Sequence, residues 1–206
     1  MQRRTVFILF GGAVVLAAVA AIVIGQLAGE RLVGPTPGEP PEAEPTPDPT
    51  PDREVPEDFT RVEDEEAGFA ISYPADWERL EVDDPNVRLV VTPNGADSIL
   101  VRVVPLDAEI TEEDLPAVRT FTDEFVEGED IEHVTEPTQV EVGGLPGIYY
   151  LYTFADADAD ERGVHAHYFL FDGATMFTVV LQALPLERFD PLAPTFDAVM
   201  DTFEPL

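Results

Sequence analysis

Four pairs of short segments that alternate apolar and polar residues most restrict the fold of this chain. The segments are 59–62 with 69–73, 87–92 with 98–104, 138–142 with 145–154, and 164–171 with 174–183. A period of two is typical of half-buried strands, and the connecting pairs Asn94-Gly95, Gly143-Gly144 and Asp172-Gly173 are typical of hairpin turns. Because a hairpin joins antiparallel strands, the pattern predicts an antiparallel sheet of about six strands.

Two amphipathic helices are predicted beside these strands. The first covers about 112–127, where Thr111 and Asp114 make a capping-box pattern and Pro116 must lie in the first turn. The second begins at Asp190-Pro191 and carries apolar residues at positions i, i+4, i+7 and i+11. Each helix needs a surface that covers its apolar face. The predicted fold class is therefore α+β, with the sheet flanked by helices in an α/β/α sandwich.

The first 32 residues differ from the rest in being apolar. The 20 residues from Val6 to Gly25 contain no charge, and a helix of that length spans the roughly 30 Å of a bilayer core. Arg3 and Arg4 precede this run and predict that the N-terminus is cytoplasmic. We expect residues 1–32 to be a single-pass signal-anchor in the cell membrane, with the rest of the chain extracytoplasmic. Ala18-Val19-Ala20 leaves open a cleaved signal peptide instead.

Residues 33–58 separate the predicted anchor from the predicted globular domain, residues 59–206. This segment holds nine prolines and eight acidic residues. Proline removes a backbone donor and fixes φ, so helix and sheet are excluded and an extended, disordered stalk is expected. A proline-rich linker of this composition predicts that the domain stands away from the membrane surface.

The charge of the chain restricts its partners. The net charge is −31, of which −26 falls in residues 59–206, and all eleven basic residues are arginine. Such a surface repels phosphate groups, so nucleic-acid binding is not expected. It attracts cations and basic partners, and a basic envelope protein is one class of partner that it fits. Adaptation of the surface to a salty medium or a general compositional bias is the other explanation, and the absence of lysine fits a compositional bias better than a binding site.

Salt is expected to stabilise the domain. Added monovalent salt screens the repulsion among its acidic residues, because the Debye length is only about 3 Å at 1 M. The melting temperature of residues 59–206 should therefore rise from low to molar sodium chloride, as followed by circular dichroism. A melting temperature that stays constant over this range would contradict the prediction.

Three segments of residues 59–206 resemble a known family. They are "SYPADW" at 72–77, "VEVGGLPGIYYLYTF" at 140–154 and "FDAVMDTFEPL" at 196–206. In these segments the chain is similar to the PsbP-like family, which shares its fold with a yeast Ran-binding nuclear protein. The resemblance implies an antiparallel sheet between helices and a non-catalytic accessory or protein-binding role. From the residues alone, Trp77 is predicted to be a core residue that follows the strand ended by Pro74.

Alternating acids make one candidate metal site. Asp156, Asp158 and Asp160 offer the oxygen ligands that calcium prefers, and weak binding of calcium or another divalent cation is one hypothesis. The match to an EF-hand loop fails, because Glu161 stands at the position of the required glycine. The alternative is an exposed hairpin tip whose acids are solvated.

Two histidines make a second candidate metal site. His165 and His167 are two apart on a predicted strand, so both point to one face. With a third ligand from a neighbouring strand or from His133, they would have the donor set of a zinc site. The alternative is a pair of surface or sheet-face histidines that protonate near pH 6.5 beside many carboxylates.

The sequence lacks the common catalytic patterns. It has no cysteine and no lysine, and neither Ser72 nor Ser98 lies in a G-x-S-x-G motif. We therefore expect a non-catalytic domain that binds or scaffolds an envelope partner. A carboxylate- or metal-dependent hydrolase and a divalent-cation-responsive domain are the alternatives.

Overall fold

The computed structural model describes residues 55–127, 130–156 and 161–206. The predicted anchor and the stalk up to residue 54 lie outside this part of the chain. Within the described residues, no helix is long and apolar enough to cross a membrane. The strands are β1 (Phe59–Asp64), β2 (Phe69–Pro74), β3 (Glu78–Arg79), β4 (Val87–Thr92), β5 (Ser98–Ile110), β6 (Glu132–His133), β7 (Thr138–Val142), β8 (Leu145–Asp156), β9 (Glu161–Ala183) and β10 (Glu204–Pro205). The α-helices are α2 (Leu115–Val126) and α3 (Phe189–Asp201).

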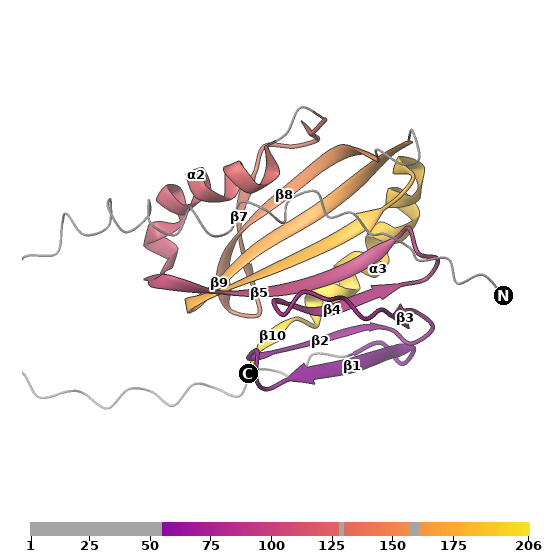
Figure 1. Ribbon diagram of the computed structural model, residues 1–206, viewed down its shortest axis with the longest axis horizontal. Helices are drawn as coiled ribbons and strands as arrows, with labels where there is room; N and C mark the ends of the chain where they lie inside the picture. Colours follow the sequence, from indigo (N-terminus) through magenta and orange to yellow (C-terminus); the bar gives the residue numbers. More distant parts are fainter. Residues whose placement is uncertain (1–54, 128–129, 157–160) are drawn as a thin grey trace, which may run out of the picture.

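The strands form two antiparallel sheets where one was expected. The larger sheet has the order β3-β4-β5-β9-β8-β6, with β7 also paired to β8, and the smaller has the order β1-β2-β10 (Figure 1). The chain leaves the small sheet after Pro74, where the Trp77 amide donates to the Pro74 carbonyl in a tight turn. The two-residue strand β10 pairs with the free edge of β2. The hairpin pattern predicted β1 with β2, but it does not show that β2 pairs with no strand of the larger sheet, so periodicity alone did not reveal the second sheet.

Strand β9 reverses direction at Asp172-Gly173, as the turn signal predicted. Its first arm, 161–170, pairs with β8, and its second arm, 173–182, pairs with β5. His165 and Gln182 lie 17 positions apart and yet are hydrogen-bonded at 2.8 Å, whereas a straight strand would separate them by more than about 50 Å. Gly173 has a φ of 53°, which accommodates the reversal. The two arms therefore lie side by side at the centre of the larger sheet (Figure 1).

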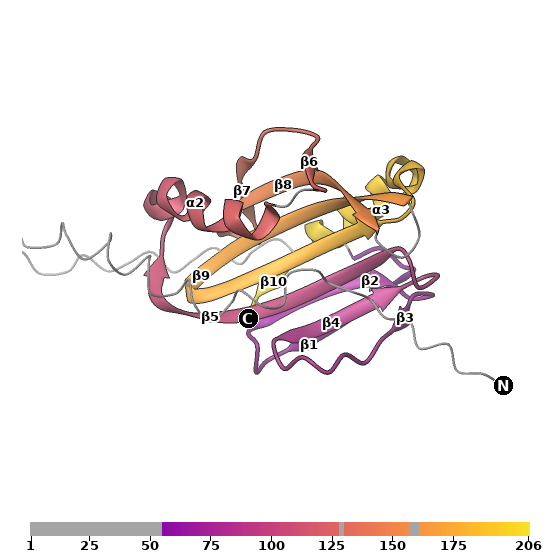
Figure 2. The same cartoon turned by 45° about the horizontal axis from the view of Figure 1, so that its top comes forward.

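The two faces of the larger sheet are covered differently. Helix α2 covers one face, and α3 together with the small sheet covers the other (Figure 2). The core under α2 includes Leu115, Val118 and Val126 of the helix with Tyr150, Phe169 and Phe171 of the sheet. The core on the other face includes Phe69, Ile71, Trp77, Leu170, Phe177, Val179, Phe196 and Val199. Trp77 is buried there, as predicted. The α+β class is confirmed, and the second sheet joins α3 in its layer.

Both helices begin close to the predicted residues. Glu112–Asp114 form a 3₁₀ turn, and α2 itself starts at Leu115 with Pro116 in its first turn. The Thr111 amide donates to Asp114 Oδ2 at 3.0 Å, as the capping box requires. Helix α3 begins at Phe189, one residue before the predicted cap, because a 3₁₀ turn at Leu186–Arg188 leads directly into it.

The connection between β4 and β5 is a longer hairpin than Asn94-Gly95 predicts. Five residues, 93–97, separate the two strands. Asn94 Oδ1 accepts hydrogen bonds from the amides of Ala96 and Asp97, and Thr92 Oγ1 accepts from Gly95. These side-chain acceptors hold the loop in place of a two-residue type I′ turn.

The β7–β8 turn offers a matched pair of glycine substitutions. Gly143 and Gly144 both have positive φ, at 64° and 80°. A Cβ on Gly143 would lie 2.7 Å from the Phe203 carbonyl oxygen, whereas a Cβ on Gly144 would meet no atom within 4 Å. Alanine in this conformation costs about 1–2 kcal/mol from the backbone alone. We expect Gly143→Ala to lower the free energy of unfolding by about 3 kcal/mol and Gly144→Ala by about 1 kcal/mol, because only the first adds a clash. Equal losses in urea unfolding would contradict this assignment.

Candidate functional site

Tyr152, His165 and His167 form a polar cluster on the sheet face that carries α2, in which Tyr152 and His167 are buried and His165 is half-buried. Tyr152 lies on β8 directly opposite His165 on β9, and His167 is two residues further along the same arm. Period-two geometry places the three side chains on one face. Tyr152 is 5 % exposed and His167 is 8 % exposed. The register of the β8–β9 pair therefore brings together the two histidines that the sequence singled out.

A single tyrosine hydroxyl joins the two imidazoles. Tyr152 Oη lies 3.1 Å from His165 Nδ1 and 3.1 Å from His167 Nδ1. His165 Nε2 lies 2.8 Å from Gln182 Oε1, and Gln182 Nε2 donates to the Ala96 carbonyl at 2.6 Å. The hydrogen-bonded chain therefore runs from the β4–β5 loop across both arms of β9 to β8.

The Ala96 carbonyl at one end of this hydrogen-bonded series determines which group donates and which accepts in each of its bonds. A carbonyl only accepts, so the Gln182 amide nitrogen faces Ala96 and its oxygen accepts from His165 Nε2–H. A neutral His165 then accepts from the Tyr152 hydroxyl at Nδ1, and Tyr152 in turn accepts from His167 Nδ1–H. His167 Nε2 is left as a bare acceptor. It is a buried atom without a hydrogen-bond partner among the described residues.

Burial makes both histidines poor bases. Loss of hydration lowers the pKa of His165 to about 4, against a smaller opposing effect of the Gln182 hydrogen bond. Burial also lowers the pKa of His167 well below its usual range, and the neighbouring His165 adds to this. Burial raises the pKa of Tyr152. All three groups are therefore neutral at pH 7, and the His167 ring stacks on Phe169 with a centroid distance of 4.2 Å.

The candidate metal ligands are placed as follows. His165 and His167 each direct Nδ1 to Tyr152, and His133 is an exposed residue whose ring centroid lies 6.3 Å from that of Tyr152. No group of three histidine or acidic side chains that could hold a metal ion occurs among the described residues. Asp156 ends β8, and Asp158 and Asp160 lie outside the described residues.

Sequence reasoning missed Tyr152 and Gln182 as members of this cluster. The predicted hairpins supply a signal for Tyr152, because its register partner on the next strand is His165. No local pattern marks Gln182, which reaches His165 only after β9 reverses direction.

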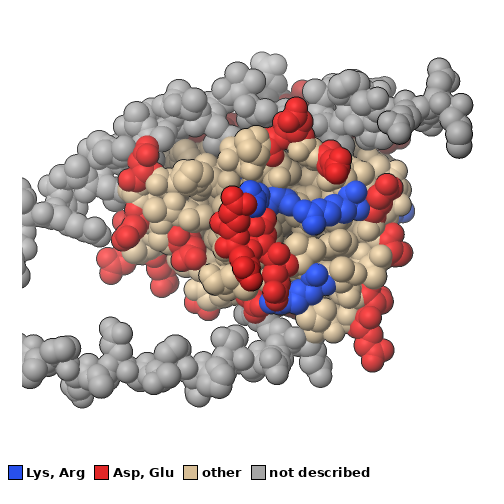
Figure 3. Space-filling model, turned by 60° about the horizontal axis from the view of Figure 1, so that its bottom comes forward, with Lys and Arg blue, Asp and Glu red and all other residues tan. Residues whose placement is uncertain are grey.

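The arginines of the described residues are the second notable feature. Six of the seven have a carboxylate within 4.0 Å: Arg61, Arg88, Arg102, Arg119, Arg162 and Arg188. Figure 3 shows one face on which basic side chains lie directly against acidic ones. Arg79 has no ion pair with a described carboxylate, and its guanidinium instead donates to the Arg88 carbonyl at 3.0 Å. A positive charge without a carboxylate partner is notable in a domain with so many acids.

Known proteins share this fold. The chain is similar to the solution structure of cyanobacterial PsbP (CyanoP) from Synechocystis sp. PCC 6803, with a TM-score of 0.52 and 17 % identity over 72 % of this chain and 93 % of that one. It is also similar to a crystal structure from Bacteroides thetaiotaomicron VPI-5482, with a TM-score of 0.51 and 13 % identity over 72 % of this chain and 49 % of that one. The comparison with curated proteins gave no match. The PsbP family profile matches residues 57–205, and the chain therefore belongs to the PsbP family.

Proposed function

We propose that this protein is a membrane-tethered, extracytoplasmic accessory domain that binds or scaffolds an envelope partner and has no catalytic activity of its own. Membership of the PsbP family supports the accessory role. The apolar run at 6–25 and the proline-rich segment that follows support the tether. The net charge of −26 on residues 59–206 favours a partner with a basic surface.

The non-catalytic part of the proposal rests on one observation: the imidazole nitrogens of His165 and His167 are hydrogen-bonded or buried. Three of the four imidazole nitrogens of His165 and His167 are hydrogen-bonded to other side chains. The fourth, His167 Nε2, is buried. A general base must reach its substrate within hydrogen-bond distance and have a pKa near the working pH, and these two histidines meet neither condition.

Crosslinking in the native envelope tests the proposed function. The full-length protein is treated with a short amine- and carboxylate-reactive crosslinker in intact cells and purified under denaturing conditions. We expect a discrete crosslinked species containing a second envelope protein, and digestion of the domain by protease added outside the cell. Turnover of a substrate that is abolished by His167→Gln would overturn the non-catalytic assignment, and complete protection from protease would overturn the location.

A further inference from the structure

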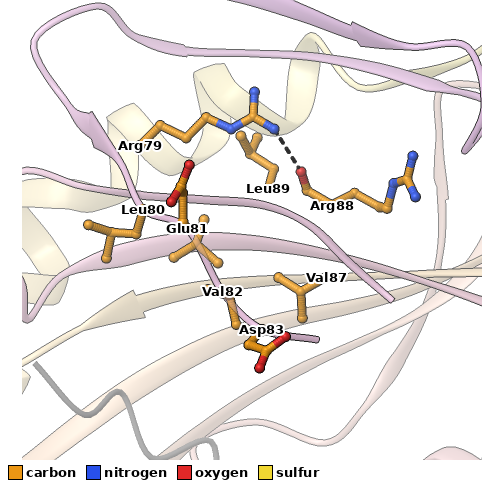
Figure 4. Close-up of a pocket in the computed structure, with 9 residues that line it drawn as sticks. Arg79, Leu80, Glu81, Val82, Asp83, Val87, Arg88 and Leu89 are labelled. Atoms are coloured by element: carbon orange, nitrogen blue, oxygen red, sulfur yellow. Dashed lines mark hydrogen bonds between the residues drawn. The ribbon is translucent and has the colours of Figure 1, made fainter. Parts of the chain in front are cut away.

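Two hollows at edges of the larger sheet differ in what they offer a partner. The larger has a volume of about 750 Å³ and is lined by residues 79–83 and 87–90. Backbone groups beside it are already paired: the Val87 amide donates to the Asp84 carbonyl, and the Arg88 carbonyl accepts from Arg79 (Figure 4). The larger hollow therefore offers no open strand edge, and the smaller one is the better candidate for a docking site.

The smaller hollow lies between helix α2 and strand β7, which are neighbours in Figure 2. It has a volume of about 280 Å³, and its lining includes the buried Leu115 and Ile148 and the exposed Arg119, Thr138 and Gln139. An apolar cavity of about 150 Å³ holds a benzene-sized group. This hollow therefore has room for one aliphatic side chain on an apolar floor, with polar groups at its rim.

The outer edge of β7 is open beside this hollow. Val142 and Leu145 flank the two-residue turn and pair with each other, so they exchange backbone hydrogen bonds. Such hydrogen-bonded pairs alternate along an antiparallel ladder, and the backbone groups of Gln139 and Glu141 therefore face away from β8. No other described strand pairs with this edge, and no backbone bond from elsewhere in the described residues reaches it. The edge can therefore accept an added strand.

Arg119 at the rim has donors to spare. The other six arginines of the described residues each donate a hydrogen bond, whereas the Arg119 guanidinium makes none with a described group. Its carboxylate neighbours, Asp123 and Glu136, lie 3.8 and 3.7 Å away, which is beyond hydrogen-bond distance. Exposed ion pairs of this kind contribute little, so the guanidinium is available to a ligand carboxylate.

We propose that this hollow binds the carboxyl terminus of a partner protein, with the last side chain on the apolar floor and the terminal carboxylate on Arg119 and the Gln139 amide. This inference rests on the proposed function of partner binding and says where the partner docks. At the end of a chain one residue supplies both an aliphatic side chain and a carboxylate. An internal acidic residue would place its carboxylate where the aliphatic group belongs, so a chain end fits the hollow better.

The position of Arg119 determines the direction of the added strand. Arg119 lines the hollow together with Gln139, near the start of β7, so a chain that ends there runs antiparallel to β7. Residues two apart on a strand lie on one face, and the residue two before the last therefore lies opposite the exposed Glu141. A basic side chain is favoured at that position. Strand addition derives affinity from backbone bonds and specificity from alternate side chains.

Two synthetic peptides test the role of the carboxylate on the full-length protein. Both end in lysine, threonine and valine, and they differ only in whether the last residue has a free carboxylate or a carboxamide. We expect the free acid to bind about tenfold more tightly by fluorescence anisotropy, as a charge-assisted contact provides. Non-specific attraction to the acidic domain would give the reverse order, because the carboxamide peptide is the more positive of the two.

Three variants assign the contact to this hollow. Arg119→Gln should abolish the preference for the free acid, and Arg79→Gln, at the other hollow, should retain it. Gln139→Pro should weaken the free acid at least tenfold, because proline removes an amide that faces away from β8 and leaves the ladder intact. Equal or reversed affinities on the unmodified protein would overturn the proposal, as would a preference that survives Arg119→Gln or binding undiminished by Gln139→Pro.

Two exposed positions separate failure of this inference from failure of the proposed function. Gln139 lines the smaller hollow, and Val82, which is 41 % exposed, does not. A photocrosslinking residue is placed at each position in turn in the native envelope. We expect a crosslink from position 139 to the last residues of an envelope protein and none from position 82. A crosslink from 82 alone would overturn the docking site and leave partner binding intact, and the absence of both would overturn partner binding as well.

Discussion

The free energy of unfolding of this domain is expected to fall by about 4 kcal/mol between pH 7 and pH 5, through His165 and His167. Burial lowers the pKa of His165 to about 4 and that of His167 well below its usual range. In the unfolded chain both imidazoles bind protons near pH 6.5. Below that pH the unfolded state holds more protons than the folded state, so each histidine destabilises the fold by about 2 kcal/mol at pH 5.

The direction of this effect distinguishes it from the titration of the acidic surface. A lowered histidine pKa contributes stability that is fully present above pH 6.5 and is lost as the pH falls toward the folded pKa. Relief of repulsion among the exposed carboxylates acts in the opposite direction. A loss of stability as the pH falls from 6.5 to 5 therefore has the sign that the histidines predict.

Urea unfolding at pH 7, 6 and 5 measures the effect. The chain has only three histidines, which makes the assignment tractable. His165→Gln should remove about half of the pH dependence, because glutamine offers the same kind of polar contacts without a titrating group. His133→Gln changes an exposed residue and should leave the pH dependence unaltered. A free energy of unfolding that is constant from pH 7 to 5 would show that the imidazoles of His165 and His167 are not held neutral in the folded state.

Replacement of Asp97 by alanine is expected to lower the free energy of unfolding by about 3 kcal/mol. The Asp97 side chain is fully buried. Its Oδ1 accepts from the Leu184 amide at 3.0 Å, and its Oδ2 accepts from Asn94 Nδ2 and Arg188 Nε, each at 2.7 Å. The carboxylate therefore ties the β4–β5 loop to the segment that enters α3. Alanine would leave a buried backbone amide without an acceptor and break the ion pair with Arg188.

Asp84→Ala is the matched control for this substitution. Asp84 also pairs with an arginine, Arg102, but its side chain is 29 % exposed and water replaces the lost contacts more easily. We expect a loss of about 1 kcal/mol. Asp97→Asn should fall between the two, because the amide oxygen still accepts from Leu184 while the charge is gone. If Asp97→Ala costs no more than Asp84→Ala, the buried carboxylate does not hold the loop to α3.

Local patterns were sufficient for most of the elements in residues 59–206. The paired turns at Gly143-Gly144 and Asp172-Gly173 identified hairpins that the structure has. The capping pattern at Thr111 located the start of the first helix within a few residues. These features depend on interactions between residues close in sequence, so a single sequence contains the information that specifies them.

The same reasoning failed where a distant residue decided the outcome. Asn94-Gly95 predicted a two-residue turn, but the loop is lengthened by Asp97, whose partners Leu184 and Arg188 are about 90 positions away. The second sheet is separate because β2 pairs only with β1 and the two-residue strand β10 and with no strand of the larger sheet. The hydrogen-bonded series through His165 and His167 includes the side chain of Gln182, which lies on the second arm of β9.

By itself the sequence determined the α+β class, the hairpins, the two helices and the face shared by His165 and His167, because periodicity and turn chemistry act over a few residues. Only the tertiary structure decided that the strands divide into two sheets and that the Tyr152 hydroxyl is hydrogen-bonded to both imidazoles. It also decided that the Arg79 guanidinium has no carboxylate partner among the described residues and donates to a backbone carbonyl. These outcomes depend on which strand edges meet and which side chains then come within hydrogen-bond distance of each other, and no spacing along the chain encodes that.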